Sequence, residues 1–110
     1  MAMGRLKLTT ETDGGVALIS AAGELDASEV AKLEAALLEA EAEEELTRLI
    51  LDITALEFMD SSGIAALAHA ASRSEENGNR LEISRSTPPV ERVLEISGIG
   101  PYLPRPQAVA

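Results

Sequence analysis

The sequence contains no cysteine, no tryptophan and a single histidine, and it is poor in aromatic residues. Without cysteine the chain forms neither disulfides nor thiolate metal sites, and His69 alone cannot build a histidine-rich zinc centre. Phe58 and Tyr102 are the only residues with large aromatic rings, too few to stack single-stranded bases or to line an aromatic ligand pocket. We therefore expect no metal and no other cofactor.

Basic residues are also scarce. Nine lysines and arginines stand against nineteen aspartates and glutamates, which gives a formal net charge of -10. Such a chain repels phosphate backbones and anionic lipid headgroups, so neither nucleic acid nor a membrane surface is an expected partner. The N-terminal "MAMGRLKL" lacks the apolar core of a signal peptide, and no stretch approaches the roughly 20 apolar residues of a membrane span. These features predict a cytoplasmic protein.

The length and composition are those of one globular domain. The chain has 110 residues, of which 45% are hydrophobic and 25% charged, close to the average for soluble globular proteins. A domain of this size buries roughly 65% of the surface that its unfolded chain exposes. We expect one domain over residues 1–110, with loose ends at 1–4 and 105–110.

The first half of the chain predicts a hairpin followed by a helix. Apolar and polar residues alternate over 5–12, the segment "DGG" at 13–15 suits a tight turn because of its glycines, and residues 16–22 are typical of an inner strand. Residues 29–46 then carry apolar side chains at helical spacing among strong helix formers. Ser28 is the expected N-cap of this helix, and the glutamates near its end are interpreted as a solvated helix face rather than a binding tail.

The second half alternates strands with helices. Residues 48–54 form a short apolar run of strand length, and residues 62–76 have a helical pattern that ends at Gly78, a residue suited to a C-cap. Alternation returns at 80–85. A last helix is predicted within 87–98, where two prolines suit the first turn and an apolar stripe follows.

The predicted order is therefore β-β-α-β-α-β-α, to which Tyr102 and Leu103 add a possible fifth short strand. Helical crossovers join parallel strands, whereas a tight hairpin joins antiparallel ones. This combination predicts an α/β domain with a mixed sheet of four to five strands and helices packed mainly on one face.

Parallel strands place their carboxyl ends at one edge of the sheet, where sites of open α/β sheets form. The strands at 16–22 and 48–54 are joined through one helix. The segments that follow them are "GELD", residues 23–26, and "EFMDSSG", residues 57–63. We expect these two segments to lie side by side.

This edge would bring the carboxylates of Asp26 and Asp60 towards Ser61 and Ser62. We do not expect these four residues to form an enzyme active site. A nucleophile elbow needs a glycine two residues before the serine, which is absent here. His69 lies roughly 12 Å along a helix from Ser61, too far to act as its base. A nucleotide loop needs several glycines and a lysine, and an acid–base carboxylate pair needs a substrate pocket that the sequence does not indicate.

Two interpretations of Ser61 remain open on the residues alone. Asp and Ser are ordinary helix starts, because their side chains accept hydrogen bonds from the free N–H groups of a first turn. Alternatively, a serine at this position can point its hydroxyl outward and accept a phosphoryl group, whose negative charge a helix N-terminus tolerates.

Three segments of the sequence resemble one family, and together they extend over nearly the whole chain. The segments "GELD", "LILDITALEFMDSSGIAAL" and "PPVERVLEISGI" resemble the STAS domain family, most closely the bacterial anti-sigma factor antagonists. The resemblance implies that Ser61 is phosphorylated by a cognate anti-sigma factor that is also a serine kinase. Asp60 and Gly63 match the neighbours of that serine, Ser62 falls at the adjacent hydroxyl position, and Asp26 ends the "GELD" motif.

The resemblance also implies a mechanism of partner switching without catalysis. The unphosphorylated domain would bind the kinase and displace its sigma factor, and phosphorylation would abolish that binding. A metal-dependent serine phosphatase is a further expected partner, and the protein is expected to be a monomer or a weak dimer. The acidic end of the first helix and the proline-interrupted tail depart from the family pattern and leave the partner's identity open.

Neighbouring residues are expected to support the site. Glu24 in "GELD" and Met59 before the serines are predicted to take part in partner binding or in its support. For Phe58, Met59 and Ile64 we favour packing beneath the loop over anchoring an interface, because large apolar side chains are more often buried. An alternative function with the same fold is an accessory subunit of a lipid or anion transport complex, which would need no phosphoryl acceptor.

Overall fold

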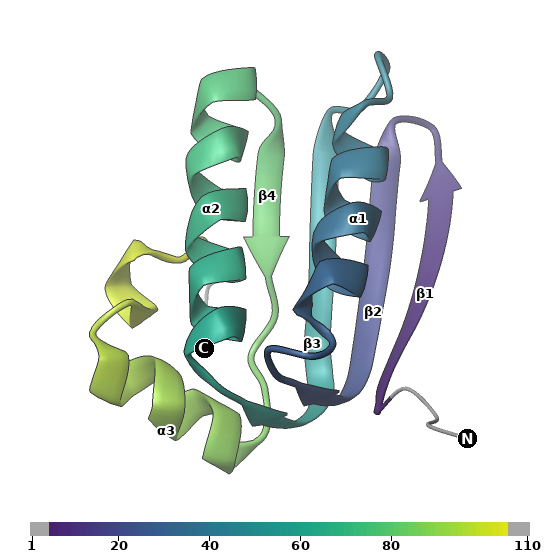
Figure 1. The fold of residues 1–110 in the computed structure, drawn as a ribbon. Helices are drawn as coiled ribbons and strands as arrows, with labels where there is room; N and C mark the ends of the chain where they lie inside the picture. Colours follow the sequence, from purple (N-terminus) through teal and green to yellow (C-terminus); the bar gives the residue numbers. More distant parts are fainter. Residues whose placement is uncertain (1–4, 106–110) are drawn as a thin grey trace, which may run out of the picture.

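A computed structural model describes residues 5–105 of the chain, and in it a four-stranded sheet carries three α-helices (Figure 1). The elements are β1 (Leu6–Asp13), β2 (Val16–Leu25), α1 (Val30–Glu41), β3 (Arg48–Met59), α2 (Ser61–Asn77), β4 (Arg80–Ile83), α3 (Pro88–Ser97) and the 3-10 helix η1 (Gly100–Tyr102). The strand order is β1-β2-β3-β4, with β1 antiparallel to β2 and the other pairs parallel. The predicted mixed sheet and element order are confirmed.

Glycines close the hairpin between β1 and β2 as the sequence predicts. Gly14 and Gly15 both have positive φ, 56° and 86°, and Asp13 pairs directly with Val16 across the turn. Two successive positive φ angles match the right-handed twist of the flanking strands, and glycine adopts them without steric cost. A glycine also ends α2: Gly78 has φ 76° at the predicted C-cap.

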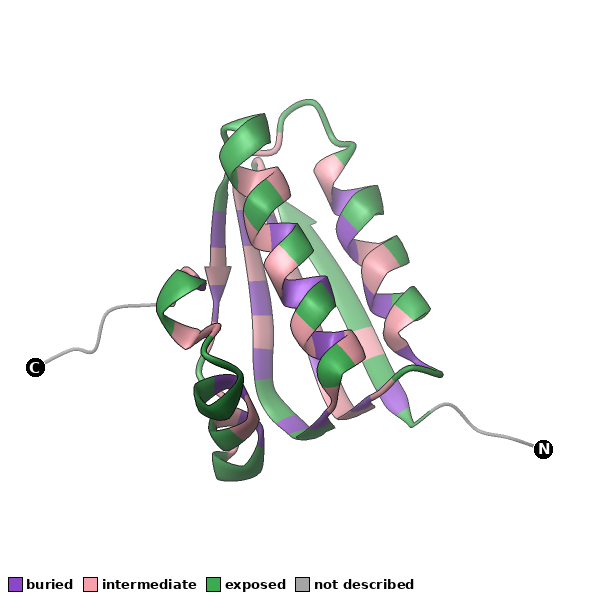
Figure 2. Cartoon of the chain, turned by 60° about the vertical axis from the view of Figure 1, so that its left-hand side comes forward, coloured by how far each residue is buried: buried purple, intermediate pink, exposed green. Residues whose placement is uncertain are grey.

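One face of the sheet holds the core. Helices α1 and α2 lie side by side over this face, and their buried residues point to the strands (Figures 1 and 2). The largest fully buried side chains are Ile19, Leu25, Leu33, Leu37, Leu49, Leu51, Ile53, Leu56, Met59, Leu67, Ile83 and Leu94. Helix α3 lies beyond the end of β4 and buries Val90 and Leu94. The opposite face of the sheet carries half-buried residues such as Leu18 and Ile50.

Both central strands are longer than predicted. β2 continues from residue 22 to Leu25 and β3 continues from residue 54 to Met59, so "EFM" is the end of a strand and not a loop. Two register shifts accompany this extension, after which Glu24 pairs with Phe58 and Leu25 with Met59. These irregularities break the alternation that sequence patterns detect.

The prediction that Ser28 caps the first helix is wrong. α1 begins at Val30, and Glu29 occupies the N-cap position without a side-chain capping bond. The Ser28 hydroxyl instead donates to the carboxylate of Asp26 at 2.7 Å. An Asp that binds the backbone two residues on makes its own turn and takes the serine away from the helix.

The C-terminal region differs from expectation in two places. Tyr102 belongs to η1 and Leu103 follows it, so the possible fifth strand is not formed. The Arg105 guanidinium donates to the carbonyl oxygens of Ile83 and Ser84 and pairs with Glu91, so this residue is held rather than loose. The rest of the predicted loose ends, residues 1–4 and 106–110, lies outside the described residues.

Within residues 5–105, no helix is both long enough and apolar enough to cross a membrane.

Candidate functional site at the carboxyl edge of the sheet

The site is built on Asp60, which links the starts of α1 and α2. One carboxylate oxygen of Asp60 accepts the backbone N–H of Ser62 at 2.9 Å and that of Gly63 at 3.4 Å, which caps α2. The other oxygen accepts the N–H of Ala27 at 3.2 Å, in the loop that follows "GELD". The two segments predicted to lie side by side are therefore joined by one side chain.

Ser61 is the first residue of α2, and its side chain is exposed. Asp60 caps the helix, so the Ser61 hydroxyl is not needed for capping; no hydrogen bond joins it to any part of residues 5–105. Ser62, one position on, is half-buried. The structure thus distinguishes the two serines by exposure, and it makes Ser61 the more accessible nucleophile.

Asp26 and Glu24 lie beside Arg5 at the same edge. The Arg5 guanidinium pairs with the Asp26 carboxylate and lies 3.5 Å from that of Glu24. The hydrogen bond from the Ser28 hydroxyl, with those from backbone N–H groups and the charge of Arg5, keeps the pKa of Asp26 below its ordinary value. Asp26 is therefore an ionised, fixed acceptor at neutral pH.

Glu29 is a further carboxylate at this edge that the sequence analysis did not single out. Its side chain is buried, accepts the backbone N–H of Arg5 and pairs with Lys32 at 2.7 Å. The hydrogen bond from Lys32 and that from the Arg5 backbone lower the pKa of Glu29. No pattern in the sequence reveals this role, because the contact to Arg5 spans 24 positions. Glu29 fixes the start of β1 against the loop before α1.

Gly63 and Met59 pack beneath the serines. Met59 is buried, with 2% of its surface exposed, and Gly63 is buried above it. A Cβ atom at Gly63 would lie 2.6 Å from the Met59 side chain and 2.9 Å from that of Leu25. Glycine therefore lets α2 start close to the ends of β2 and β3, and Met59 supports the loop from inside.

The expectation that all three apolar residues near the serines pack inward holds only in part. Met59 is buried and Ile64 packs against the core, whereas Phe58 is 46% exposed. The prediction for Phe58 is wrong because β3 extends through residue 58, and its neighbours Leu56 and Met59 take the buried positions. An aromatic ring is thus presented to solvent three residues before Ser61.

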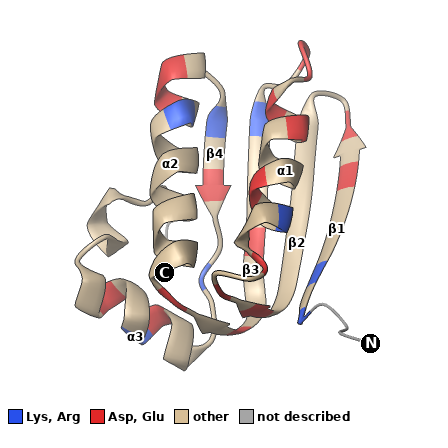
Figure 3. Cartoon of the chain, in the orientation of Figure 1, with Lys and Arg blue, Asp and Glu red and all other residues tan. Residues whose placement is uncertain are grey.

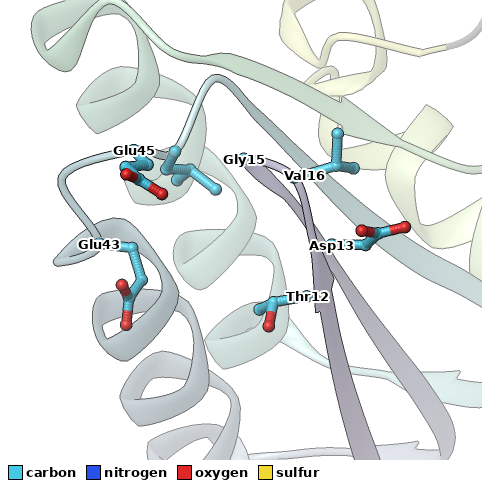
Figure 4. A pocket seen from close by; sticks show the side chains of 8 residues that line it. Thr12, Asp13, Gly15, Val16, Glu43 and Glu45 are labelled. Carbon is cyan, nitrogen blue, oxygen red and sulfur yellow. The ribbon is translucent and has the colours of Figure 1, made fainter.

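A pocket of about 220 Å³ lies at the opposite end of the sheet (Figure 4). The β1–β2 turn and the segment after α1 line it, and its charged side chains are Asp13, Glu43 and Glu45. None of the predicted site residues lies there. Within residues 5–105, no three His, Asp or Glu side chains are grouped so that they could hold a metal ion.

A model of the STAS domain matches residues 7–108. The chain belongs to the STAS domain family. This STAS domain is 27% identical over 99 residues to the anti-sigma F factor antagonist of Paenibacillus polymyxa. The aligned region covers 90% of this chain and 85% of that protein. A relative from Mycobacterium tuberculosis, provisionally named an anti-anti-sigma factor, is 35% identical over 100 residues. The aligned region covers 90% of this chain and 68% of the relative.

Solved structures of the anti-sigma factor antagonist SpoIIAA share the fold of this STAS domain. Unphosphorylated SpoIIAA is 26% identical to this chain and superimposes on it with a TM-score of 0.75. The match covers 92% of this chain and 89% of SpoIIAA. The phosphorylated form of the Bacillus protein gives 25% identity and a TM-score of 0.69, and covers 92% of each chain. SpoIIAA thus exists in both phosphorylation states.

Proposed function

We propose that this STAS domain is an anti-sigma factor antagonist, a non-catalytic cytoplasmic module that binds its anti-sigma factor when Ser61 is unmodified. Phosphorylation of Ser61 by that anti-sigma factor, acting as a serine kinase, abolishes binding. The observation that carries the proposal is the exposed Ser61 hydroxyl, unengaged within the described chain, at a helix start that Asp60 caps. The names of the relatives supply the class of partner.

The position of Ser61 suits a reversible modification. As the first residue of α2 it lies at the positive end of the helix dipole, where added negative charge is favourable. A phosphoryl group adds a charge of about -1.5 to -2. Because Asp60 already satisfies the N–H groups of Ser62 and Gly63, the modification need not rearrange the helix start.

The consequence of phosphorylation falls on the partner. An unpaired phosphoryl group in an interface costs on the order of several kcal/mol, and each 1.4 kcal/mol is about tenfold in affinity. Glu24, Asp26 and Asp60 place three carboxylates at this edge against the one guanidinium of Arg5, and Figure 3 shows acidic segments there. The added phosphoryl group would therefore stand among carboxylates, where nothing compensates its charge, and we propose that exposed Phe58 is the apolar anchor for the partner.

The test is phosphorylation of the purified chain. The protein is incubated with ATP and the anti-sigma factor kinase encoded in its genome, and mass spectrometry then counts added phosphoryl groups. We expect one group on the wild type, none on Ser61→Ala, and one on Ser62→Ala, the matched control. Equal modification of Ser61→Ala and wild type would refute Ser61 as the acceptor.

Binding is measured in the same preparation. Unmodified protein should bind the kinase in a pull-down, and the phosphorylated protein should not. A phosphatase that removes the group should restore binding. Co-purification with membrane transporter subunits, with no binding to the kinase, would instead support a transport accessory subunit.

A further inference from the structure

The two edges of the sheet are treated differently by the fold. β4 has only 4 residues, and at its end the N–H of Ile83 donates to the carbonyl of Pro104 at 2.8 Å. β1 has 8 residues and pairs with β2 without a register shift, and among residues 5–105 no strand lies on its other side. An edge strand that carries no bulge or proline is a template for pairing with another strand.

The backbone groups that face outward from β1 follow from the ladder. The N–H of Glu24 donates to the carbonyl of Arg5 at 3.0 Å, so Arg5 faces β2 with its backbone groups. In an antiparallel ladder this orientation alternates along the strand. Lys7, Thr9 and Glu11 therefore also face β2, and the N–H and C=O groups of Leu8 and Thr10 point to the open edge.

The charges on β1 are unevenly distributed. Figure 3 shows basic residues at the start of the strand and acidic residues near its end. Lys7 and Glu11 are both exposed, lie on the same face of the strand, and form no ion pair with any residue from 5 to 105. A strand with this distribution is complementary to a copy of itself that runs in the opposite direction.

We propose that a second copy of this chain pairs with β1 edge to edge, antiparallel, about a two-fold axis at Thr9. In this register Leu8 and Thr10 of one copy exchange backbone hydrogen bonds with Thr10 and Leu8 of the other. Lys7 of each copy lies opposite Glu11 of the other. A shift by two residues in one direction would place Lys7 opposite Thr9, with no charge to pair. A shift in the other direction would place Lys7 opposite Asp13 but leave Glu11 opposite Thr9.

The rest of the fold permits this approach. Figure 1 shows α1 over the centre of the sheet, while β1 stands outside the helix layer. The two-fold axis places the Ser61 sites at opposite ends of a continuous sheet, so pairing leaves both open. The proposal does not depend on the role of Ser61, since it rests on the edge of β1 alone.

Charge reversal tests the register. At about 0.15 M salt the Debye length of roughly 8 Å screens the net charges of the two chains but not close cross-strand pairs. We expect sedimentation equilibrium of the full chain to detect a dimer, and Lys7→Glu or Glu11→Lys to raise its dissociation constant about tenfold, because each creates like-charge pairs on both sides of the axis. The double variant K7E/E11K should restore wild-type dimerisation.

Cross-linking provides a second measurement. The chain has no cysteine, and residues opposite each other in a non-hydrogen-bonded pair lie about 4.5 Å apart at Cα, within reach of a disulfide. Thr9→Cys should therefore form disulfide-linked dimers on mild oxidation, and Thr12→Cys, on the same strand, should not. A chain that stays monomeric at all concentrations, a double variant without rescue, or equal cross-linking of both cysteine variants would each overturn the proposal.

Discussion

Asp60 accepts a hydrogen bond at 3.2 Å from the backbone N–H of Ala27, 33 positions earlier in the chain, with the oxygen that does not cap its own helix. The contact ties the loop before α1 to the start of α2. Two separate losses therefore follow from removing one carboxylate: the cap of a 17-residue helix and the link between the loops.

Asp60→Ala should lower the free energy of unfolding by about 1–2 kcal/mol, because loss of an N-cap side chain costs that much. Asp60→Asn keeps one oxygen acceptor for the helix cap and should lose less. Urea unfolding followed by circular dichroism measures both, with an unchanged m-value as the sign of a two-state comparison. An alanine variant within about 0.5 kcal/mol of wild type would contradict the capping role.

Ser61→Glu should separate stability from binding. A carboxylate in the first turn of α2 interacts favourably with the helix dipole, by about 0.3–1 kcal/mol, so the variant should be no less stable than wild type. Its affinity for the anti-sigma factor should fall at least about tenfold. Calorimetry measures the affinity. Ser72→Glu, exposed further along the same helix, is the matched control and should bind as wild type does.

Gly63→Ala should destabilise the domain although alanine is the better helix former. The added Cβ would meet the side chains of Met59 and Leu25 at 2.6 and 2.9 Å, and overpacking of this kind costs about 1–3 kcal/mol. Ala65→Gly, at an exposed position of the same helix, measures the helix-propensity term alone, about 1 kcal/mol. Chemical denaturation of both variants is the measurement, and a stabilised Gly63→Ala variant would refute the packing argument.

The Glu91–Arg105 pair should make stability depend on pH. Burial acts to raise the pKa of Glu91, but hydrogen bonds from Arg105 and from the backbone of Ser86 outweigh it and lower that pKa. A carboxyl group whose pKa is lowered by folding stabilises the protein above its unfolded pKa, about 4.3, and this contribution is lost as the pH falls through the lower folded value.

Glu91→Gln should therefore be less stable than wild type by a constant amount above about pH 5.5, and the difference should shrink towards pH 3. Urea unfolding at several pH values measures this dependence. Glu95→Gln, exposed on the same helix, should show no such convergence. A difference between Glu91→Gln and wild type that grows on acidification would have the wrong sign for the proposed cause.

The order of the elements could be predicted because local patterns decide it. The glycines at the hairpin turn and at Gly78, the prolines that open α3 and the periodicity of each helix all act within a few residues. The edge at which "GELD" and "DSSG" meet follows from the parallel pairing of β2 and β3. These parts of the site were accessible without the structure.

The missed features depend on contacts between distant segments. β3 runs on to Met59 because β2 pairs with it through two register shifts, and nothing in "ALEFM" alternates as a strand does. The Glu29 carboxylate and the Arg105 guanidinium each bind groups more than ten positions away. Hydrophobicity alone predicts that Phe58 is buried, whereas its position in β3, beside buried Met59, leaves it exposed.

The hydrogen bond from the N–H of Ile83 to the carbonyl of Pro104 limits how many subunits the sheet can join. A sheet that offers two open edges can add subunits without limit, whereas here one edge is already occupied at its end by the chain's own C-terminal segment. Pairing through β1 then uses the remaining edge of both copies at once. Assembly of this domain through its sheet would therefore terminate at two subunits.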